Sequence, residues 1–411
     1  FAVGTAYDPL GTGRNDHAIF VGLCDMDNSK NTAKICYWVQ NLVNNKRSEL
    51  QKIADAPMWA CKKPGYGELE YQEFRHYFNV TAGDYDGDGK MTAVITYAGN
   101  DDLWGIAGTG ISGEQSLSRK SFVKSKGSGN AYFDGWNTTL YERDQITKSL
   151  VSADIDRDGC DELIVYAGIA DPDKIDGKDK ELSGDSFRKA VSKLSVYKAE
   201  NGNLKRVDQK SLMTLNREDE KADGSRYYDH IRYGNLAAGD INGDGWQEII
   251  VAGYFREVRE EKQKGFIWDK KTDNENMGFA VYYGQNKSIT NVQKTTMSGY
   301  TANGTKDLGV KPKPAMTSVA INGRGTPEQV WIAGGLYEVQ QNGALNLLRD
   351  TAREKNSSAR WWWYQDVIAG NFDHNTEGRE QVIALAAERQ KGSGSGRKFD
   401  LFTDVFYGEN F

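Results

Sequence analysis

A run of oxygen-bearing side chains at alternate positions is the part of this sequence best suited to chemistry. It comprises Asp240, Asn242 and Asp244, followed by Gly245 and, four positions after Asp244, by Glu248. Alternate side chains of a curled loop can point at one centre, and Ca²⁺ is a hard cation that takes about six to eight oxygen ligands. The glycine permits the positive φ that such a turn needs. The spacing therefore predicts a calcium-binding loop.

Two other stretches repeat this pattern, beginning at Asp84 and at Asp154. In each copy, loop positions one, three and five offer side chains, position seven a backbone carbonyl, and position nine an acid or a hydroxyl. The expected ligands are Asp84, Asp86, Asp88, Lys90 (carbonyl) and Thr92; Asp154, Asp156, Asp158, Cys160 (carbonyl) and Glu162; and Asp240, Asn242, Asp244, Trp246 (carbonyl) and Glu248. Because Thr92 replaces an acid, we expect weaker binding there, and two to three Ca²⁺ ions in all. The alternative is a turn held by aspartate hydrogen bonds without an ion, although three converging carboxylates would repel one another.

Three degenerate copies begin at residues 25, 320 and 371. Ala320 and Arg324 stand at ligand positions of the second of these, which predicts no ion there, since the Arg cation can take the place of the metal. The weaker metal candidates of the other two copies are Asp25, Asp27, Asn371, Asp373 and Asn375.

Short apolar runs rich in β-branched residues flank each loop, and they predict a strand on either side. The copies start at residues 25, 84, 154, 240, 320 and 371, so successive copies are 59, 70, 86, 80 and 51 residues apart. This is the length that one four-stranded propeller blade needs. We therefore expect an all-β chain in which residues 1–411 form a single β-propeller domain. Six blades are favoured, with the strand Phe1–Tyr7 closing the last blade, and seven blades are the alternative.

The repeated loop with its flanking strands resembles the FG-GAP (VCBS) repeat of integrin α-subunit heads and of bacterial surface propellers. The resemblance covers nearly the whole chain, and three of the copies match its calcium loop well. It implies an extracellular, calcium-stabilised module of cell adhesion that binds a protein or a glycan.

Composition excludes several classes of protein. The net charge of −6 argues against a general nucleic-acid binder, and no apolar run is long enough to span a membrane. Since the chain starts at Phe1 without a signal-like segment, we expect it to be part of a longer polypeptide or assembly. Calcium loops of this kind suit a compartment rich in Ca²⁺, which predicts a secreted or cell-surface protein. Cys24 and Cys36 flank the first loop and either pair as a disulfide or remain free thiols.

The ends of the strands away from the acidic loops carry a different set of residues. Long polar insertions are expected after Gly99, Gly168 and Gly253, the first of them reaching about Asn130. Aromatic clusters precede the first strand of three blades, and exposed aromatic rings suit recognition of a sugar or a protein. The expected ligand-binding residues are Arg75, His76, Tyr77, Tyr227, Tyr228, His230, Trp361, Trp362, Trp363 and Tyr364. Packing between blades is the alternative role for these rings.

No catalytic signature is present: the sequence holds no Gly-x-Ser-x-Gly, no His-Glu-x-x-His and no phosphate-binding glycine loop. We therefore expect no catalytic residues and a binding or adhesion module. A polysaccharide lyase or glycosidase on a calcium-bearing propeller is the first alternative, because its carboxylates can assemble across blades. A structural spacer in a larger surface protein is the second.

Overall fold

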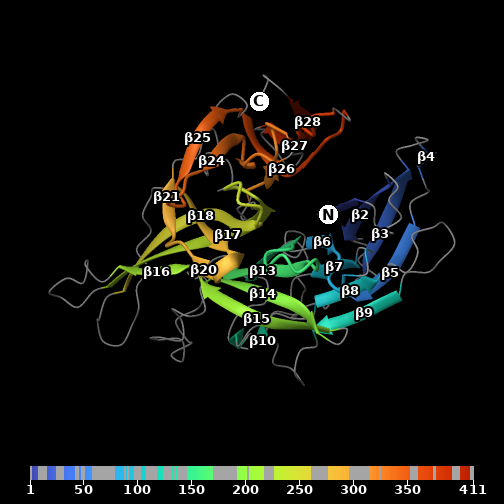
Figure 1. The fold of residues 1–411 in the computed structure, drawn as a ribbon, viewed down its shortest axis with the longest axis horizontal. Coiled ribbons are helices and arrows are strands. Elements are labelled where there is room, and N and C mark those ends of the chain that lie inside the picture. Colours follow the sequence, from blue (N-terminus) through green and yellow to red (C-terminus); the bar gives the residue numbers. More distant parts are fainter. Residues whose placement is uncertain are drawn as a thin grey trace. The chain divides into compact units, whose positions relative to one another are not determined.

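A computed structural model of residues 1–411 shows an all-β chain (Figure 1). In several strands, including every strand before residue 79, only the backbone pairing is described. The structure describes residues 2–7, 16–24, 32–41, 46–47, 51–57, 79–87, 89, 92–96, 103–107, 118–123, 132–133, 136–137, 146–169, 192–200, 203–216, 226–260, 276–295, 314–323, 325–351, 360–373, 376–390 and 399–407.

The chain divides into two compact units. The first comprises residues 1–182 and 193–210, and the second comprises residues 183–192 and 211–411. The single propeller domain and its closed ring therefore remain predictions. In the part of the chain that the structure describes, no helix is both long and apolar enough to cross a membrane.

Antiparallel sheets build the first unit. The first sheet has the order β1-β2-β3-β4, and β5 also pairs with β3; its strands are Ala2–Tyr7, Asp16–Cys24, Thr32–Asn41, Lys46–Arg47 and Gln51–Pro57. The second sheet, β6 to β9, consists of Asn79–Gly83, Thr92–Thr96, Leu103–Ala107 and Ser118–Val123. A short pair follows, β10 (Tyr132–Phe133) with β11 (Trp136–Asn137). The third sheet, β12 to β15, consists of Ile146–Ala153, Glu162–Ile169, Ser192–Glu200 and Asn203–Ser211.

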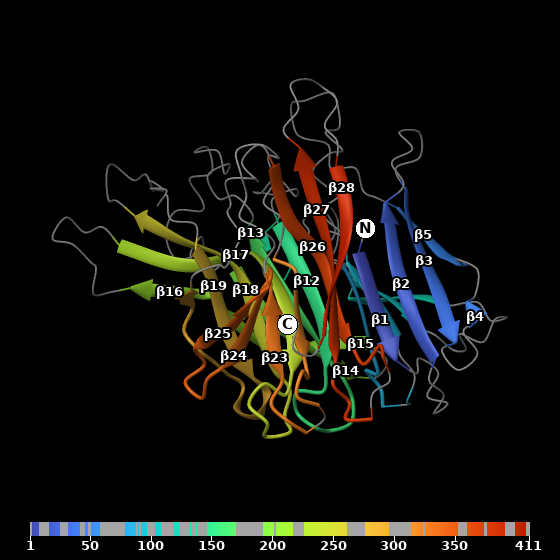
Figure 2. The ribbon, with the colours of Figure 1, turned by 90° about the horizontal axis from the view of Figure 1, so that it is seen from above.

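The second unit continues this pattern. Its first sheet has the order β16-β17-β18-β19-β20, and β21 also pairs with β19; the strands are Met213–Asn216, Arg226–Gly239, Glu248–Glu260, Asn276–Tyr283, Ser288–Ile289 and Gln293–Thr295. The 3₁₀ helix η5 (Gly284–Asn286) follows β19. The next sheet, β22 to β25, consists of Met316–Val319, Gln329–Ile332, Gly335–Val339 and Leu345–Asp350. The last is a three-stranded sheet of β26 (Arg360–Gly370), β27 (Gln381–Gln390) and β28 (Phe399–Phe406), shown in red in Figure 2.

Every one of the six loop copies joins two neighbouring strands of one sheet. The connections are β2 to β3, β6 to β7, β12 to β13, β17 to β18, β22 to β23 and β26 to β27, and each pair is antiparallel. The predicted strands on either side of each loop copy are thus confirmed, and each pair lies in a sheet of its own. Within each unit the strands that lead into these loops also lie against one another, namely β6 with β12, β17 with β22, and β22 with β26.

The predicted place of the N-terminal strand is wrong. β1 pairs with β2 along its whole length, from Ala2 opposite Gly22 to Tyr7 opposite His17, whereas the last sheet consists of β26, β27 and β28. A strand that pairs with its neighbour in the chain closes only a short loop, which costs less conformational entropy than closing a loop of nearly the full chain length.

The insertion predicted after Gly99 is also wrong. Leu103–Ala107 of this stretch forms β8, which pairs with β7, and Ser118–Val123 forms β9, which pairs with β8 and completes the second sheet. The Gly and Lys residues around these strands concealed them, because such residues are depleted in strands.

The register between β2 and β3 excludes the disulfide considered for the first sheet. Cys24 lies opposite Ala33, and Cys36 lies opposite Val21. The two cysteines are thus offset by three residues along the strands, or roughly 10 Å, whereas a disulfide needs Cα atoms within about 7 Å.

Each unit has its own apolar core. In the first unit Leu163, Val165, Tyr197 and Leu204 pack with Tyr85. In the second, Trp331 is fully buried and packs edge-on against Tyr364, with ring centroids 4.8 Å apart. Leu163, Trp331 and Tyr364 come from strands that flank a loop copy, and Tyr85 lies in such a loop, so these loops are anchored to the apolar cores.

A backbone clasp links each of three loops to the sheet that follows in the chain. The Asp84 N–H donates to Asp161 Oδ2 (2.8 Å), and the Asp161 N–H donates back to the Asp84 carbonyl (2.7 Å). Ala320 and Glu380 repeat this pair of bonds at 2.9 and 3.0 Å. In the third of these clasps, the Glu328 N–H donates to the Asp240 carbonyl (2.9 Å), and the Glu328 carboxylate accepts from the Asp240 backbone. The clasp fixes the first residue of each loop.

Glycine precedes two of the clasped residues because the next sheet comes close. A Cβ on Gly83 would stand 2.7 Å from Ser152 Cβ and 2.8 Å from Asp161 Oδ2. A Cβ on Gly239 would collide with the Glu328 carboxylate and lie 2.8 Å from Ser318 Cβ. The Gly-Asp pairs that open these two loops therefore serve the contact between sheets as well as the turn.

Removal of one clasp is expected to destabilise the fold. Glu380→Ala leaves the Ala320 N–H without its acceptor, so the free energy of unfolding in urea should fall by about 1–3 kcal/mol. Glu377→Ala is the matched control, because Glu377 forms only an exposed ion pair with Arg379. The control should cost at most about 0.5 kcal/mol, and equal losses in the two variants would contradict the clasp.

Candidate metal centres

The loop between β12 and β13 is held by its own acidic side chains. Asp154 accepts hydrogen bonds from the backbone N–H groups of Asp158 (3.2 Å) and Gly159 (3.1 Å). Gly159 has φ of 86°, which allows the chain to curl around the carboxylate. At the end of the loop, Glu162 Oε2 accepts from the Ile155 N–H (3.1 Å). Ligand oxygens of Asp154, Asp156 and Glu162 lie within 4.8 Å of one another, a spacing at which they could hold one cation.

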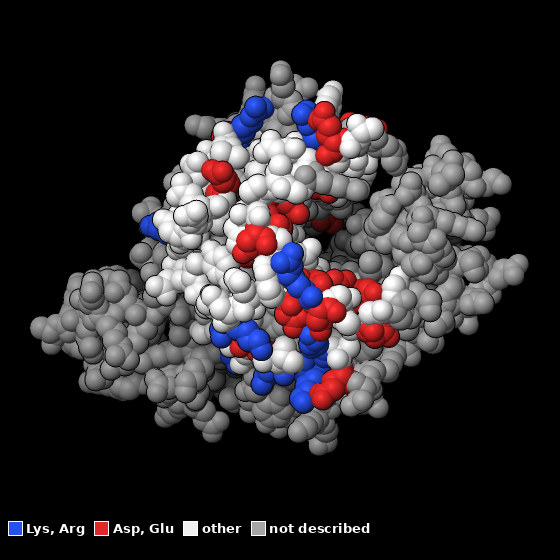
Figure 3. Space-filling model, viewed as in Figure 1, with Lys and Arg blue, Asp and Glu red and all other residues white. Residues whose placement is uncertain are grey.

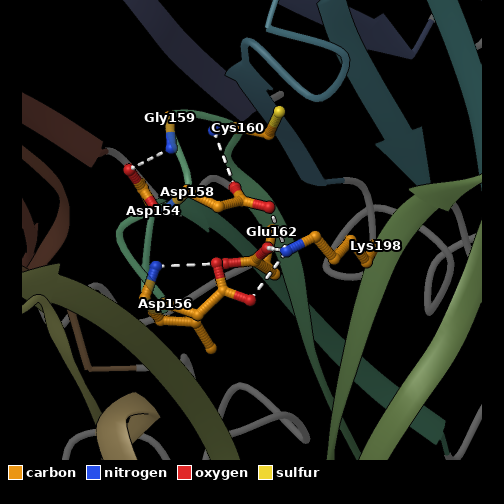
Figure 4. Close-up of polar contacts among 8 residues, drawn as sticks. Asp154, Asp156, Asp158, Gly159, Cys160, Glu162 and Lys198 are labelled. Carbon is orange, nitrogen blue, oxygen red and sulfur yellow. Dashed lines mark hydrogen bonds and ion pairs between the residues drawn. The ribbon is translucent and has the colours of Figure 1, made fainter.

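A lysine from the third strand of the same sheet reaches into this loop (Figure 4). Lys198 Nζ lies 2.7 Å from Asp156 Oδ2 and 3.4 Å from Glu162 Oε1, and it also pairs with Asp158 Oδ2. Although burial opposes it, hydrogen bonds to Asp156 and Asp158 raise the pKa of Lys198, so the ammonium group stays charged at neutral pH. The sequence analysis did not anticipate this residue, because it lies far along the chain from the loop.

The loop between β17 and β18 has the same hydrogen-bond frame. The Gly245 N–H donates to Asp240 Oδ2 (2.9 Å), the Trp246 N–H to Asp244 Oδ1 (2.8 Å), and the Ile241 N–H to Glu248 Oε2 (3.2 Å). The corresponding bonds of the loop before β13 join Gly159 to Asp154, Cys160 to Asp158, and Ile155 to Glu162. The repeat read from the sequence is therefore a repeat of local geometry.

One carboxylate oxygen of this loop lacks a partner. Asp240 Oδ1 is buried and has no hydrogen-bond partner among the described residues. The Asn242 amide nitrogen donates to Asp244 Oδ2 (3.1 Å) and Glu248 Oε1 (3.2 Å), so these acidic side chains converge. Since a buried oxygen without a partner is costly, and a divalent cation would satisfy it, the residues present fit Ca²⁺.

The loop between β6 and β7 shares part of this frame. The Gly89 N–H donates to Asp84 Oδ2 (2.8 Å), as Gly159 and Gly245 do to their aspartates. Tyr85 fills the buried position that Ile155 and Ile241 occupy in the other two loops. Asp86 lies in the described part of this loop and is exposed, whereas Asp88 and Lys90 lie outside it. The first residue of β7 is Thr92, for which only the backbone is described.

In the loop between β26 and β27, a glutamine amide forms hydrogen bonds at the position where the acidic loops have a glutamate. Gln381 Oε1 accepts from the backbone N–H groups of Phe372 (2.7 Å) and Asp373 (3.2 Å), and Gln381 Nε2 donates to Asp373 Oδ1 (3.1 Å). Gln381 thus stands where Glu162 and Glu248 stand in the other loops, and Gln329 takes the same place before β23. A glutamine adds no charge, so each of these loops has one carboxylate fewer at this position than the loops that end in Glu162 and Glu248. Asn371 is partly buried, and Asn375, Asp25 and Asp27 lie outside the described residues, as does Arg324.

Burial and crowding of negative charge raise the pKa values of the two glutamates that end the acidic loops. Burial first, and then Asp244, raise the pKa of Glu248 to about 8. Burial and Asp156 raise the pKa of Glu162 to about 7, and Lys198 partly opposes them. Figure 3 shows acidic side chains gathered in groups on the described surface, with basic side chains beside some of them. The carboxylates around Glu162 and those around Glu248 therefore repel one another, and a bound cation would reduce this repulsion.

The residues expected to bind a ligand are only partly described, and one of them is buried. Tyr364 is fully buried in the core of the second unit, so its assignment to a binding surface is wrong. It lies in β26 together with Trp361, Trp362 and Trp363, for which only the backbone is described. Tyr227, Tyr228 and His230 lie in β17, where only the backbone is described at these positions, while Arg75, His76 and Tyr77 lie outside the described residues.

No protein-family model matches this chain, and no curated protein matches it. Among solved structures, the rhamnogalacturonan lyase YesW is similar with a TM-score of 0.36 and 12% identity, over 93% of this chain and 69% of that one. An α-L-arabinofuranosidase, Arb93A of Fusarium graminearum, gives 0.44 and 8% over 94% and 87%, and a PL25 ulvan lyase gives 0.37 and 9% over 93% and 80%. At such low scores and identities these matches carry no conclusion about activity. The FG-GAP resemblance remains a prediction.

Without metal, stability should fall as the pH rises. A Glu248 pKa of about 8 in the folded state, against 4.5 for the free side chain, means that the folded protein binds this proton more tightly. Its stabilising effect is complete below pH 4.5 and is lost as the pH rises towards 8. In EDTA, the melting temperature of wild-type protein should therefore decrease over this range more than that of Glu248→Gln, which has no proton to lose. Parallel profiles for the two proteins would contradict the assignment.

Proposed function

We propose that this chain is a calcium-stabilised β-propeller that binds a polysaccharide outside the cell. The observation that carries the calcium part is the loop between β17 and β18, where acidic side chains converge and Asp240 Oδ1 is buried without a hydrogen-bond partner among the described residues. The ion would lie between Asp240, Asn242, Asp244, the Trp246 carbonyl and Glu248. It would neutralise the loop and hold the β17–β18 connection in place, which is a structural role.

The polysaccharide part rests on the composition of the strand ends opposite the loops. β17 pairs with β18 from Gly239 opposite Glu248, next to the acidic loop, to Arg226 opposite Glu260 at the far end. Tyr227 lies opposite Arg259 near that far end. In the last sheet Trp361 lies opposite Arg389 and Trp362 opposite Glu388, again at the end away from the loop. Aromatic platforms combined with charged hydrogen-bonding groups suit sugar rings, and the arginines favour polymers that carry carboxylates.

Incubation of the protein with a panel of polysaccharides tests both the binding proposal and the alternative of an enzyme. The named substrates of the similar structures, rhamnogalacturonan and ulvan, together with an arabinan, give a panel of polymers to test. Retention of the protein by one polymer without new chain ends supports a binding module. Release of unsaturated or reducing ends would instead make the chain a lyase or a glycosidase. Binding to none of the polymers would sink the proposal and leave a spacer or a protein-binding module.

Removal of calcium is expected to lower thermal stability. EDTA should decrease the melting temperature, excess Ca²⁺ should restore it, and Mg²⁺ should not, because Mg²⁺ needs a smaller octahedral site. Asp240→Ala should reduce the calcium-dependent part of this shift more than Asp25→Ala. Differential scanning calorimetry measures both effects, and a melting temperature indifferent to EDTA at neutral pH would contradict the structural role of the ion.

Substitution of the tryptophans in β26 separates binding from packing. Trp361→Ala with Trp363→Ala should weaken retention on the polysaccharide at least about tenfold, in line with the loss of aromatic anchors, and change the melting temperature little. Tyr364→Ala is the control for packing and should cost about 3–5 kcal/mol of stability, since it empties a fully buried position. A comparable loss of stability in the tryptophan variant would show that these residues belong to the core.

A further inference from the structure

Two equivalent sheets carry different residues at one position of their third strand. In β14 the strand reads Val196-Tyr197-Lys198, and in β19 it reads Val281-Tyr282-Tyr283. Tyr197 and Tyr282 are both buried, so the two segments sit alike in their own sheets. Tyr283 pairs directly with Glu248 at the end of its acidic loop, and Lys198 contacts Glu162, the equivalent of Glu248. Lysine and tyrosine thus occupy the same place beside two copies of one loop.

The residue at the third loop position also differs between these two sheets. Asp156 stands beside Lys198, whereas Asn242 stands in the sheet that carries Tyr283. At the expected ligand positions, the loop before β13 therefore holds one more carboxylate than the loop before β18, and an ammonium group lies beside these carboxylates. The net charge of the two sites is the same, −3 in each, when Asp154, Asp156, Asp158, Glu162 and Lys198 are compared with Asp240, Asp244 and Glu248.

The ammonium group is placed where a metal ion would bind. Lys198 Nζ contacts Asp156, Asp158 and Glu162, which are three of the expected calcium ligands. The Glu162 side chain is almost fully buried, and its Oε1 has no hydrogen-bond partner among the described residues; the Lys198 ammonium group faces this oxygen at 3.4 Å. The ammonium group and a metal ion coordinated by these oxygens could not be present together, because both are positively charged and they would occupy the same volume.

We propose that Lys198 is a tethered cation that competes with divalent metal for the loop before β13, so that this loop closes on its own ammonium group when calcium is scarce and binds Ca²⁺ more weakly than the loop before β18. The inference deepens the proposed function and rests on it, because it takes Ca²⁺ as the ligand of the second of these loops. Lysine is suited to this role, since its flexible stem allows the ammonium group to withdraw into solvent when a metal ion displaces it.

Calorimetric titration with CaCl₂ tests the competition. In an Asp240→Ala background, which removes a ligand of the loop before β18, Lys198→Met should tighten calcium binding to the loop before β13 at least about tenfold, because binding there no longer has to displace an ammonium group. The reciprocal change, Tyr283→Lys in otherwise wild-type protein, should weaken binding at the loop before β18. Unchanged affinity in Lys198→Met would overturn the inference.

The melting temperature in EDTA gives a second measurement, made without calcium. In EDTA, Lys198→Met should lower the melting temperature, since three carboxylates lose their counter-ion, and saturating Ca²⁺ should recover most of the loss. If Lys198→Met does not fold in EDTA, the double variant Asp156→Asn with Lys198→Tyr takes its place, because it reproduces the side chains of the loop before β18 and should bind Ca²⁺ as that loop does. Failure of this double variant to gain affinity over wild type would also overturn the inference.

The two hypotheses fail in different ways. If wild-type protein takes up no calcium but Lys198→Met gains one site, the calcium role of the loop before β18 is wrong and the competition by Lys198 stands. If wild-type protein binds calcium and Asp240→Ala abolishes it, while Lys198→Met adds nothing, the calcium role stands and the competition is wrong.

Discussion

The concentration of negative charge in a tight turn between two paired strands is the constraint on which this structure depends. Each turn gains its shape from carboxylates that accept backbone N–H groups, as Asp154 and Asp240 do. The same carboxylates then lie close together and partly out of water, where like charges repel strongly. Every loop must therefore contain a counter-charge or replace an acid with a neutral group. The loops of this chain differ mainly in which solution they use.

The described loops compensate this negative charge in three ways. The loop before β18 keeps Glu248 and leaves Asp240 Oδ1 without a hydrogen-bond partner in the described residues, which suits a metal ion. The loop before β13 uses the ammonium group of Lys198. The loop before β27 uses Gln381, which accepts and donates within the turn and adds no charge. The side chain at the start of the second strand separates the loop of Gln381 from those of Glu162 and Glu248, and Lys198 separates the loop before β13 from the loop before β18.

Much of this arrangement could be predicted from the sequence, because it is local. The alternate acids, the glycines and the apolar runs define each hairpin within about twenty residues, a range over which spacing is informative. The contacts that depend on distant residues were missed: Lys198 reaches its loop from the third strand, and Asp161, Glu328 and Glu380 hold the loop of the preceding sheet. β8 and β9 were hidden by composition. Tyr364 was placed on a surface because four successive aromatic residues do not show which face is buried.

The clasp between sheets has a consequence for biosynthesis. The residue that holds each loop belongs to the sheet that lies later in the chain, as Asp161 holds Asp84 and Glu380 holds Ala320. During translation, a hairpin that has just left the ribosome still lacks the residue that fastens it. Each of these three loops is therefore fastened only when the following sheet has been synthesised, and until then it lacks the hydrogen bonds of its clasp.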